Sequence, residues 1–150
     1  MPRCNGKPAV VLLAEDDPAD QELTRRALLE DVIKTELHVV SDGEMALDYL
    51  YQRGPFADAA TAPRPDLLLL DLNMPRIDGK EVLRQMRSDP ELRRIPVVVL
   101  TTSKQEEDII RSYDLGCNSF ITKPVDIDGF IRTVRALGSY WFELVTLPPF

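Results

Sequence analysis

Four short, mostly polar stretches of this chain each come at the end of a run of apolar, often β-branched residues. The polar stretches are residues 14–17, 71–75, 101–103 and 123–124, and the apolar runs before them are residues 9–13, 67–70, 97–100 and 120–121. Continuous apolar runs of this length are typical of strands that are buried on both faces of a parallel sheet. Residues that follow such strands gather at one edge of an open α/β sheet, where ligands bind. We therefore expect the four stretches to meet in one site.

The remaining segments fit the same architecture. Strands are expected at residues 9–13, 36–40, 67–70, 95–100 and 119–122, and helices at about 18–29, 44–50, 79–87, 106–115 and 126–137. Strands that alternate with helices through short links predict an α/β fold with a five-stranded parallel sheet, doubly wound so that helices cover both faces. In the first helix, Leu23, Ala27 and Leu28 are expected to face inward.

Two segments go beyond a minimal five-strand unit. Residues 52–65 form a longer Ala/Pro-rich connection, which we expect to be a surface loop. Residues 139–150 form an apolar C-terminal extension whose aromatic residues are Tyr140, Trp141, Phe142 and Phe150. Leaving such a segment in water costs about 25 cal/mol per Å² of apolar surface. It either folds back on its own core or docks against a second subunit, and both alternatives stay open at this point.

Length and composition exclude several classes of protein. The 150 residues suffice for one domain with a real core and are too few for two ordinary domains. We expect a single domain over residues 1–150, with a core at about 9–138. The net charge of −7 disfavours a nucleic-acid-binding surface. No apolar run approaches the roughly 20 residues of a membrane span, and the N-terminus lacks the apolar segment of a signal peptide.

These features predict a cytoplasmic protein that does not enter a membrane. Cys4 and Cys117 are then expected to be thiols. A zinc site is disfavoured, because the two cysteines and the single histidine, His38, lie far apart without the spacing of zinc ligands.

The acids at the predicted sheet edge indicate a cation site. Two carboxylates about 4 Å apart repel each other by roughly 4 kcal/mol at an effective dielectric constant of 20. If Glu15, Asp16 and Asp71 converge, they need a cation or a raised pKa. Ligands that are all oxygens favour Mg²⁺ or Mn²⁺ over zinc. The alternative is that such acids merely cap helices, a role for which Asp17 is well placed before Pro18.

The other polar residues at this edge suit the transfer of a phosphoryl group. Asp71 follows the central apolar run, and a carboxylate can attack phosphorus to form an acyl phosphate. A metal ion beside it and the ammonium of Lys123 could neutralise the charge of the group. The hydroxyl of Thr101 could donate a hydrogen bond to a phosphoryl oxygen. A single lysine or threonine at a strand end is usually only a solvated residue, so the argument rests on their occurrence together.

The acidic pair, the central aspartate, the threonine and the Lys-Pro pair follow one another along the chain in this order. In this order they resemble the motifs of the receiver domain of two-component response regulators, over about residues 10–137. The resemblance implies the flavodoxin-like receiver fold, with Asp71 as the phospho-acceptor. It also implies a site for Mg²⁺, or Mn²⁺, formed by Glu15, Asp16, Asp71 and the backbone carbonyl of Asn73, in which Asp16 is a direct ligand.

The resemblance also assigns roles to residues near the end of the domain. It implies that Lys123 pairs with the phosphoryl group, that the Thr101 hydroxyl follows it, and that Phe120 rotates inward as part of the switch. The peptide bond between Lys123 and Pro124 is expected to be cis, as is usual in the family. The phosphodonor would be a phosphohistidine on a separate histidine kinase, since His38 lies within a predicted strand and is expected to be structural.

A narrower resemblance concerns the partner. Residues 71–76, 101–103 and 117–120, together with the aromatic segment 140–142, are similar to the single-domain regulators paired with bacterial and cyanobacterial phytochromes. Such regulators often form homodimers through C-terminal elements. The similarity implies a phytochrome-type kinase as partner and a homodimer that uses the last helix and residues 140–150.

The chain departs from the common receiver pattern in three places. Glu15 stands where an aspartate is commoner, which lengthens one arm of the acidic pair. Thr102 stands where many receivers have a small residue, which could narrow access to Asp71. The connection at residues 52–65 is longer than usual.

These residues are compatible with three functions. The leading hypothesis is a stand-alone response regulator that is a phospho-acceptor and not a turnover enzyme. The alternative is a phosphorylation-independent, receiver-like adaptor that acts through its aromatic extension, although an adaptor needs none of the site residues. The third is a Mg²⁺ phosphohydrolase, which usually carries an acid two residues after its nucleophile. Asn73 occupies that position here and disfavours it.

Overall fold

Five parallel strands form the centre of the molecule. The computed structural model describes residues 9–28, 35–102 and 119–123, together with Gln105, Asp108, Val125, Asp126, Asp128, Gly129 and Arg132. In chain order the described elements are β1 (Ala9–Ala14), α1 (Pro18–Leu28), β2 (Thr35–Val40), α2 (Gly43–Leu50), β3 (Leu67–Asp71), α3 (Gly79–Ser88), β4 (Val97–Thr101) and β5 (Ser119–Thr122). Short 3₁₀ turns lie at Gly54–Phe56 and Leu92–Arg94.

The strand order in the sheet is β2-β1-β3-β4-β5, and every neighbouring pair is parallel. The chain moves to one side of β1 to form β2 and then to the other side to form β3, β4 and β5. This reversal of direction lies between β1 and β3. Open α/β sheets bind ligands at such a point, at the carboxyl ends of the strands.

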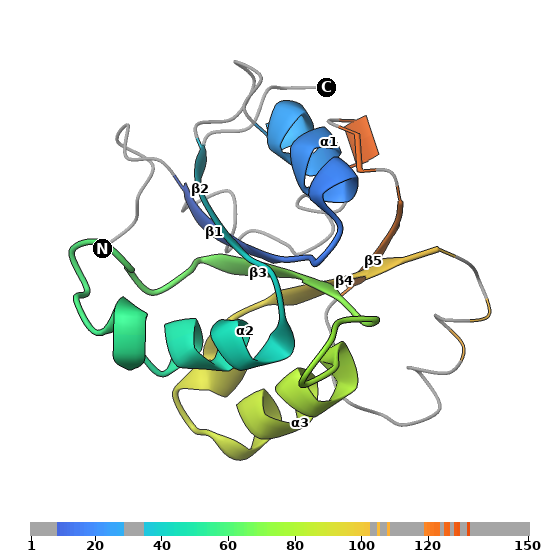
Figure 1. The fold of residues 1–150 in the computed structure, drawn as a ribbon. Helices are drawn as coiled ribbons and strands as arrows, with labels where there is room; N and C mark the ends of the chain where they lie inside the picture. Colours follow the sequence, from blue (N-terminus) through green and yellow to red (C-terminus); the bar gives the residue numbers. More distant parts are fainter. Residues whose placement is uncertain are drawn as a thin grey trace.

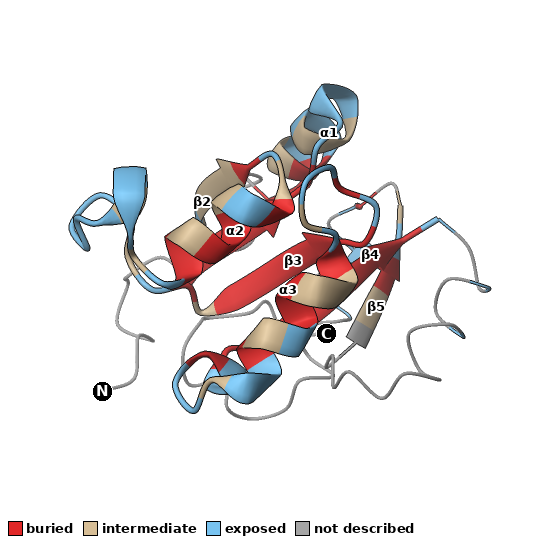
Figure 2. Cartoon of the chain, turned by 60° about the horizontal axis from the view of Figure 1, so that its bottom comes forward, coloured by how far each residue is buried: buried red, intermediate tan, exposed pale blue. Residues whose placement is uncertain are grey.

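Helices cover both faces of the sheet, with α1 on one face and α2 and α3 on the other (Figure 1). Alternate residues of each strand point to opposite faces. In β1, Val11 and Leu13 belong to a core cluster with Ala27 and Leu28 of α1, whereas Leu12 lies in a second cluster with residues of α2 and α3. Because both faces are covered, every residue of β1, β3 and β4 is buried. Figure 2 shows β3 and β4 as buried strands in red.

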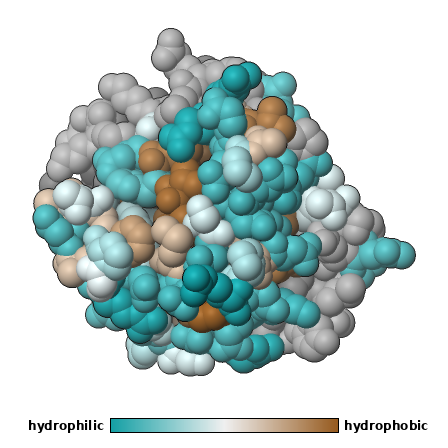
Figure 3. Space-filling model, in the orientation of Figure 1, coloured by the Kyte–Doolittle hydropathy of each residue, from teal (hydrophilic) through white to brown (hydrophobic). Residues whose placement is uncertain are grey.

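The edge strand β2 is more accessible, and of its six residues only Val40 is buried. His38 lies within this strand, as expected, and its Nε2 is 2.7 Å from Oε2 of Glu36. The face seen in Figure 3 is mostly hydrophilic, with hydrophobic side chains gathered near its middle.

The expected sheet and its five strands are confirmed, and the three fully described helices start and end within about one residue of their expected bounds. The expected helices at 106–115 and 126–137 lie largely outside the described residues, as does the C-terminal extension. One expectation for α1 is wrong: Leu23 is 45% exposed, and Thr24 is buried in its place. The buried stripe of α1 is Thr24, Ala27 and Leu28, at the three- and four-residue spacing of a helix face, and Leu23 lies beside that stripe.

The connection at residues 52–65 is mostly exposed, as expected for a surface loop. It is nevertheless attached to α2. The hydroxyl of Tyr49 donates a hydrogen bond of 2.8 Å to the carbonyl of Pro63, and the rings of Tyr49 and Phe56 lie 5.3 Å apart between centroids. Ala62 is buried. Among the residues that the structure describes, no helix has the length and hydropathy needed to cross a bilayer.

Candidate functional site

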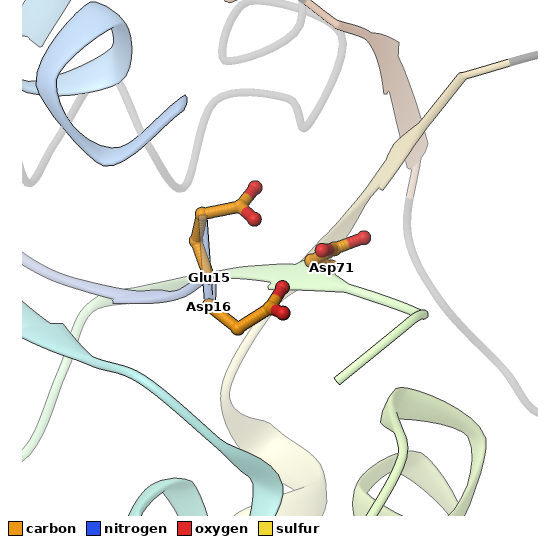
Figure 4. A group of neighbouring side chains, drawn as sticks. All are labelled: Glu15, Asp16 and Asp71. Atoms are coloured by element: carbon orange, nitrogen blue, oxygen red, sulfur yellow. The ribbon is translucent and has the colours of Figure 1, made fainter. Parts of the chain in front are cut away.

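Three carboxylates converge at the carboxyl edge of the sheet. Glu15 and Asp16 directly follow β1, and Asp71 is the last residue of β3, the neighbouring strand. One carboxylate oxygen from each residue lies within 4.8 Å of those from the other two. Figure 4 shows the three side chains side by side at this edge. The sequence predicted this convergence, because parallel neighbours end at the same edge.

Glu15 and Asp71 are buried, whereas Asp16 is exposed. Burial, with a smaller contribution from the charge of Asp71, raises the pKa of Glu15 from 4.5 to about 7, although Lys123 and the Asp17 backbone N–H act in the opposite direction. That N–H donates a hydrogen bond of 3.1 Å to Oε2 of Glu15. The site therefore favours a positive charge beside the two buried acids.

Lys123 supplies that charge from the end of β5. Its Nζ lies 2.8 Å from Oε1 of Glu15, 3.2 Å from Oδ2 of Asp20 and 3.3 Å from Oδ2 of Asp71. Burial alone would lower the pKa of Lys123, but the hydrogen bonds to Glu15 and Asp20 and the charges of Asp71 and Glu15 outweigh burial and raise it. The side chain therefore stays an ammonium ion at physiological pH.

Thr101 ends β4 and lies one residue beyond Leu100, the register partner of Asp71. The backbone N–H of Lys123 donates a hydrogen bond of 2.8 Å to the Thr101 carbonyl, which ties the ends of β4 and β5 together. The Thr101 side chain is fully buried, and within the described part of the chain its Oγ1 has no hydrogen-bond partner. A buried hydroxyl without a partner costs about 1–3 kcal/mol, so a ligand that supplied an acceptor oxygen would be stabilised here.

The loop from β3 to α3 carries Asn73 past the site. The Asn73 backbone N–H lies 3.4 Å from Oδ1 of Asp71. The Gly79 N–H donates a hydrogen bond of 3.0 Å to the Leu72 carbonyl, and a Cβ on Gly79 would come within 2.5 Å of the Asp71 carbonyl oxygen. Gly43 at the start of α2 packs even more closely, against the Ile77 carbonyl. The glycines thus let α2 and α3 hold this loop in place.

Of the residues singled out in the sequence, Glu15, Asp16, Asp71 and Lys123 lie together, with Thr101 at the end of the adjacent strand. Phe120 is half-buried and packs against the core on the side of α2 and α3. Pro124, and with it the expected cis peptide bond, and Ser103 lie outside the described residues. Asp17 caps α1, as expected, by accepting a hydrogen bond of 2.9 Å from the Ala19 N–H.

Sequence reasoning missed Asp20. It lies in the first turn of α1, where an acid is favourable beside any helix dipole, so its residue type alone drew no attention. No pattern in the sequence distinguishes it from other acids at helix starts, because its partner Lys123 lies 103 positions later.

The donor atoms fit a divalent cation. All three converging side chains are carboxylates, and hard cations such as Mg²⁺ and Mn²⁺ prefer oxygen ligands. The acidic cluster of Glu15, Asp16 and Asp71 is therefore compatible with binding of such an ion, and its chemistry does not match a thiolate or imidazole site.

Comparison with known proteins agrees with the fold and the site. The family described as response regulator receiver domain matches residues 11–135. Response regulator Rcp1 of Synechocystis sp. is 45% identical over 141 residues, which cover 94% of each chain. The structure of the bacteriophytochrome response regulator AtBRR has a TM-score of 0.80 at 42% identity and covers 89% of this chain and 94% of its own.

Two further structures are similar over nearly their whole length. The Mn²⁺-bound form of Rcp1 has a TM-score of 0.71, and the phosphorylated cyanobacterial phytochrome response regulator RcpA has one of 0.73. Each is 44% identical to this chain and covers 95% of it and 100% of its own chain. Receiver domains in general are phospho-acceptors for histidine kinases and bind a divalent metal in an acidic pocket. With its five-stranded parallel sheet and acidic edge, this chain belongs to the response regulator receiver domain family of two-component signalling.

Proposed function

We propose that this chain is a stand-alone response regulator that accepts a phosphoryl group on Asp71 from a histidine kinase and changes conformation in response. The observation that carries the proposal is the position of Asp71, buried at the end of β3 beside two further acids and 3.3 Å from the ammonium of Lys123. A phosphorylation-independent adaptor would need none of these contacts. Near-equal coverage of the relative Rcp1, 94% of both chains, supports a single-domain regulator.

In the proposed reaction, a carboxylate oxygen of Asp71 attacks the phosphorus of a phosphohistidine. The new O–P bond forms as the N–P bond breaks, and the imidazole nitrogen keeps the electron pair and then takes a proton. The ammonium of Lys123 neutralises charge on the phosphoryl oxygens. The hydroxyl of Thr101, which has no partner within the described residues, donates a hydrogen bond to one of those oxygens.

The carboxylates of Glu15, Asp16 and Asp71 and the backbone carbonyl of Asn73 are proposed to hold Mg²⁺ or Mn²⁺. When bound, this ion neutralises the acids and polarises the phosphoryl oxygens. Support comes from the all-oxygen donor set and from the Mn²⁺-bound structure of the similar protein Rcp1.

Thr101 and Phe120 are proposed to form the switch. Phe120 lies on β5 directly beside β4, where its register partner is Val99. It is only half-buried, so an inward rotation would change how much of its ring is exposed. A shift of Thr101 toward the phosphoryl group would open the space for that rotation.

The proposed partner is a phytochrome-type histidine kinase. The structures of the bacteriophytochrome response regulators RtBRR and AtBRR are similar to this chain at 43% and 42% identity. This similarity to regulators of bacteriophytochromes supports the proposed partner. A homodimer through the last helix and residues 140–150 is proposed on the apolar composition of that segment, which lies outside the described residues. The cytoplasmic location and the absence of nucleic-acid binding stay predictions.

The test is intact-mass spectrometry after incubation with acetyl phosphate and Mg²⁺. The mass should rise by one phosphoryl group per chain, and Asp71→Asn should abolish the rise. Asp58→Asn, in the exposed connection after α2, is the matched control and should be labelled to the same extent as the unaltered chain. Absence of labelling would favour the adaptor, and continuous release of phosphate from acetyl phosphate over many turnovers would favour a phosphohydrolase. Labelling that survives Asp71→Asn would place the acceptor elsewhere.

A further inference from the structure

Lys123 contacts three carboxylates, and one of them stands apart from the other two. Glu15 and Asp71 belong to the acidic cluster, whereas Asp20 lies on α1 and is not part of it. Asp20 accepts a hydrogen bond of 3.2 Å from the Lys123 ammonium. The Asp20 side chain is 28% exposed and that of Lys123 only 13% exposed, so the contact is largely shielded from water.

The first turn of α1 holds Asp20 in place. The Gln21 side chain donates hydrogen bonds of 2.6 Å to the Glu15 carbonyl after β1 and of 3.3 Å to the Ser41 hydroxyl after β2. The Gln21 backbone N–H donates to the Asp17 carbonyl at 2.9 Å. These bonds connect the helix start to the ends of two strands, and Asp20 is the residue directly before Gln21.

The arrangement matters when the acids bind a cation. In the structure, the Lys123 ammonium compensates Glu15 and Asp71. If these two carboxylates turn their oxygens to a divalent ion, Lys123 loses two of its three anionic contacts while its side chain is largely buried. An ammonium that is buried without acceptors is strongly disfavoured. Of the three contacts, the one to Asp20 does not compete with the ion for ligand atoms.

We propose that Asp20 is a positioning residue that keeps Lys123 paired when Glu15 and Asp71 face a divalent cation, and that it thereby raises the affinity of the acidic cluster for that cation. This inference rests on the proposed function of the cluster as a Mg²⁺ site. Asp20 acts through Lys123 and is not itself a ligand.

A simpler explanation must be separated from this one, because any nearby negative charge attracts a cation. Asp17 provides the comparison. It lies between Asp16 and Asp20 in the sequence, is exposed, and accepts a hydrogen bond from the Ala19 N–H instead of contacting Lys123. Asp17→Asn removes one charge and keeps an oxygen that can cap the helix, so it measures the effect of charge alone.

The experiment is isothermal titration calorimetry with MgCl₂ on the full chain and its variants. Asp20→Asn should weaken binding about tenfold, which corresponds to the loss of one hydrogen bond between charged groups. Asp17→Asn should weaken it less than about threefold, because exposed charges are screened by solvent and salt. Asp20→Glu, which can still reach Lys123, should recover most of the affinity.

A double-mutant cycle shows whether Asp20 acts through Lys123. In a Lys123→Met background, Asp20→Asn should change the Mg²⁺ dissociation constant by less than about threefold, since the group that Asp20 positions is gone. An effect of Asp20→Asn that persists in this background would overturn the inference, as would equal effects of Asp20→Asn and Asp17→Asn. In both cases the unaltered chain would still bind Mg²⁺, so the proposed function would stand.

A spectroscopic measurement keeps the inference testable if the Lys123→Met variant does not fold. In ¹⁵N spectra of the side-chain ammonium groups, the Lys123 signal should remain protected from exchange with water when Mg²⁺ is added to the unaltered chain. In Asp20→Asn it should broaden or vanish on the same addition. Protection that is unchanged in Asp20→Asn would contradict the role of Asp20. If the unaltered chain does not bind Mg²⁺, the proposed metal site fails and this inference fails with it.

Discussion

The ammonium of Lys123 donates a hydrogen bond of 2.8 Å to Glu15, a carboxylate 108 positions earlier in the sequence. The contact joins the end of edge strand β5 to the end of β1, on the opposite side of β3 and β4 in the sheet. The Lys123 ammonium is thus a counter-charge for the acids at this edge. Both side chains of the pair are largely buried, so water compensates little of their charge. The stability of the metal-free domain should therefore depend on this pair.

Replacing Lys123 by Met tests that dependence. The change leaves Glu15 and Asp71 buried without a cation, so the free energy of unfolding near pH 8 should fall by about 3 kcal/mol, as is usual when one partner of a buried pair is removed. Urea denaturation without divalent metal measures the loss. Arg26→Met is the control, because its ion pair with Glu22 is exposed and its removal should cost less than about 0.5 kcal/mol. Equal losses would argue against Lys123 as the counter-charge.

The raised pKa of Glu15 predicts a pH-dependent difference between the unaltered chain and Glu15→Gln. The folded chain binds this proton more tightly than the unfolded chain, since the pKa rises from 4.5 to about 7. The stability that Glu15 contributes is therefore complete below about pH 4.5 and is lost as the pH rises through about 7. Glu15→Gln, which resembles the neutral form, should be more stable by up to about 3 kcal/mol near pH 8 and nearly unchanged near pH 4.5.

Chemical denaturation of the metal-free proteins at these two pH values measures the difference. A gain in stability that is the same at both pH values would show that the effect comes from packing and not from the titration of Glu15.

Saturating Mg²⁺ should raise the melting temperature, because an ion that binds only the folded chain stabilises it by about 2.7 kcal/mol at one hundred times its dissociation constant. Asp16→Ala should remove this response. Asp16 is exposed, so the variant should fold normally without metal. Differential scanning calorimetry with and without MgCl₂ provides the measurement, with Asp58→Ala as a control that keeps the response. A full Mg²⁺ response in Asp16→Ala would exclude Asp16 as a ligand.

Gly43→Ala should destabilise the domain by about 3 kcal/mol, because the new methyl group would overlap the Ile77 carbonyl and force the loop after β3 to shift. Gly54→Ala is the matched control. Gly54 has a φ of +60° but nothing within 4 Å of a new Cβ, so only backbone strain of about 1 kcal/mol is expected. Urea denaturation of both variants tests the comparison, and a Gly54→Ala variant that is the less stable of the two would contradict it.

A homodimer through the C-terminal segment predicts that a chain ending at Gly138 is a monomer, whereas the full chain sediments as a dimer. Residues 139–150 would bury their apolar side chains against the second copy, and the same patch would be used on both chains of a twofold dimer. Analytical ultracentrifugation at micromolar concentration measures this. If both chains sediment as monomers, the segment completes the core of its own chain. If both sediment equally as dimers, the interface lies elsewhere.

Much of the site was predictable because its information is local. The apolar runs before Glu15, Asp71, Thr101 and Lys123 predict strands, and helical segments between them require parallel strands whose carboxyl ends share an edge. The convergence of the acids follows from that geometry without knowledge of any contact. The resemblance to the receiver family could also be recognised from the sequence, because its motifs are short and lie at the strand ends.

Other features depend on how elements pack. Leu23 and Thr24 are neighbours in α1, yet one is exposed and the other buried, because the rotation of the helix about its axis is set by contact with the sheet. The hydrogen bond from Lys123 to Asp20 depends on that same rotation and on the position of β5.

The sequence by itself thus determined the alternation of strands and helices, the edge at which the polar residues meet and the oxygen-rich character of the site. Only the tertiary structure decided that Glu15 is buried while Asp16 is exposed, and that Lys123 lies among Glu15, Asp20 and Asp71. The physical reason is the distance along the sequence between the residues that interact. Strand and helix patterns arise from residues a few positions apart, whereas burial and ion pairing depend on contacts between segments that only the packed fold brings together.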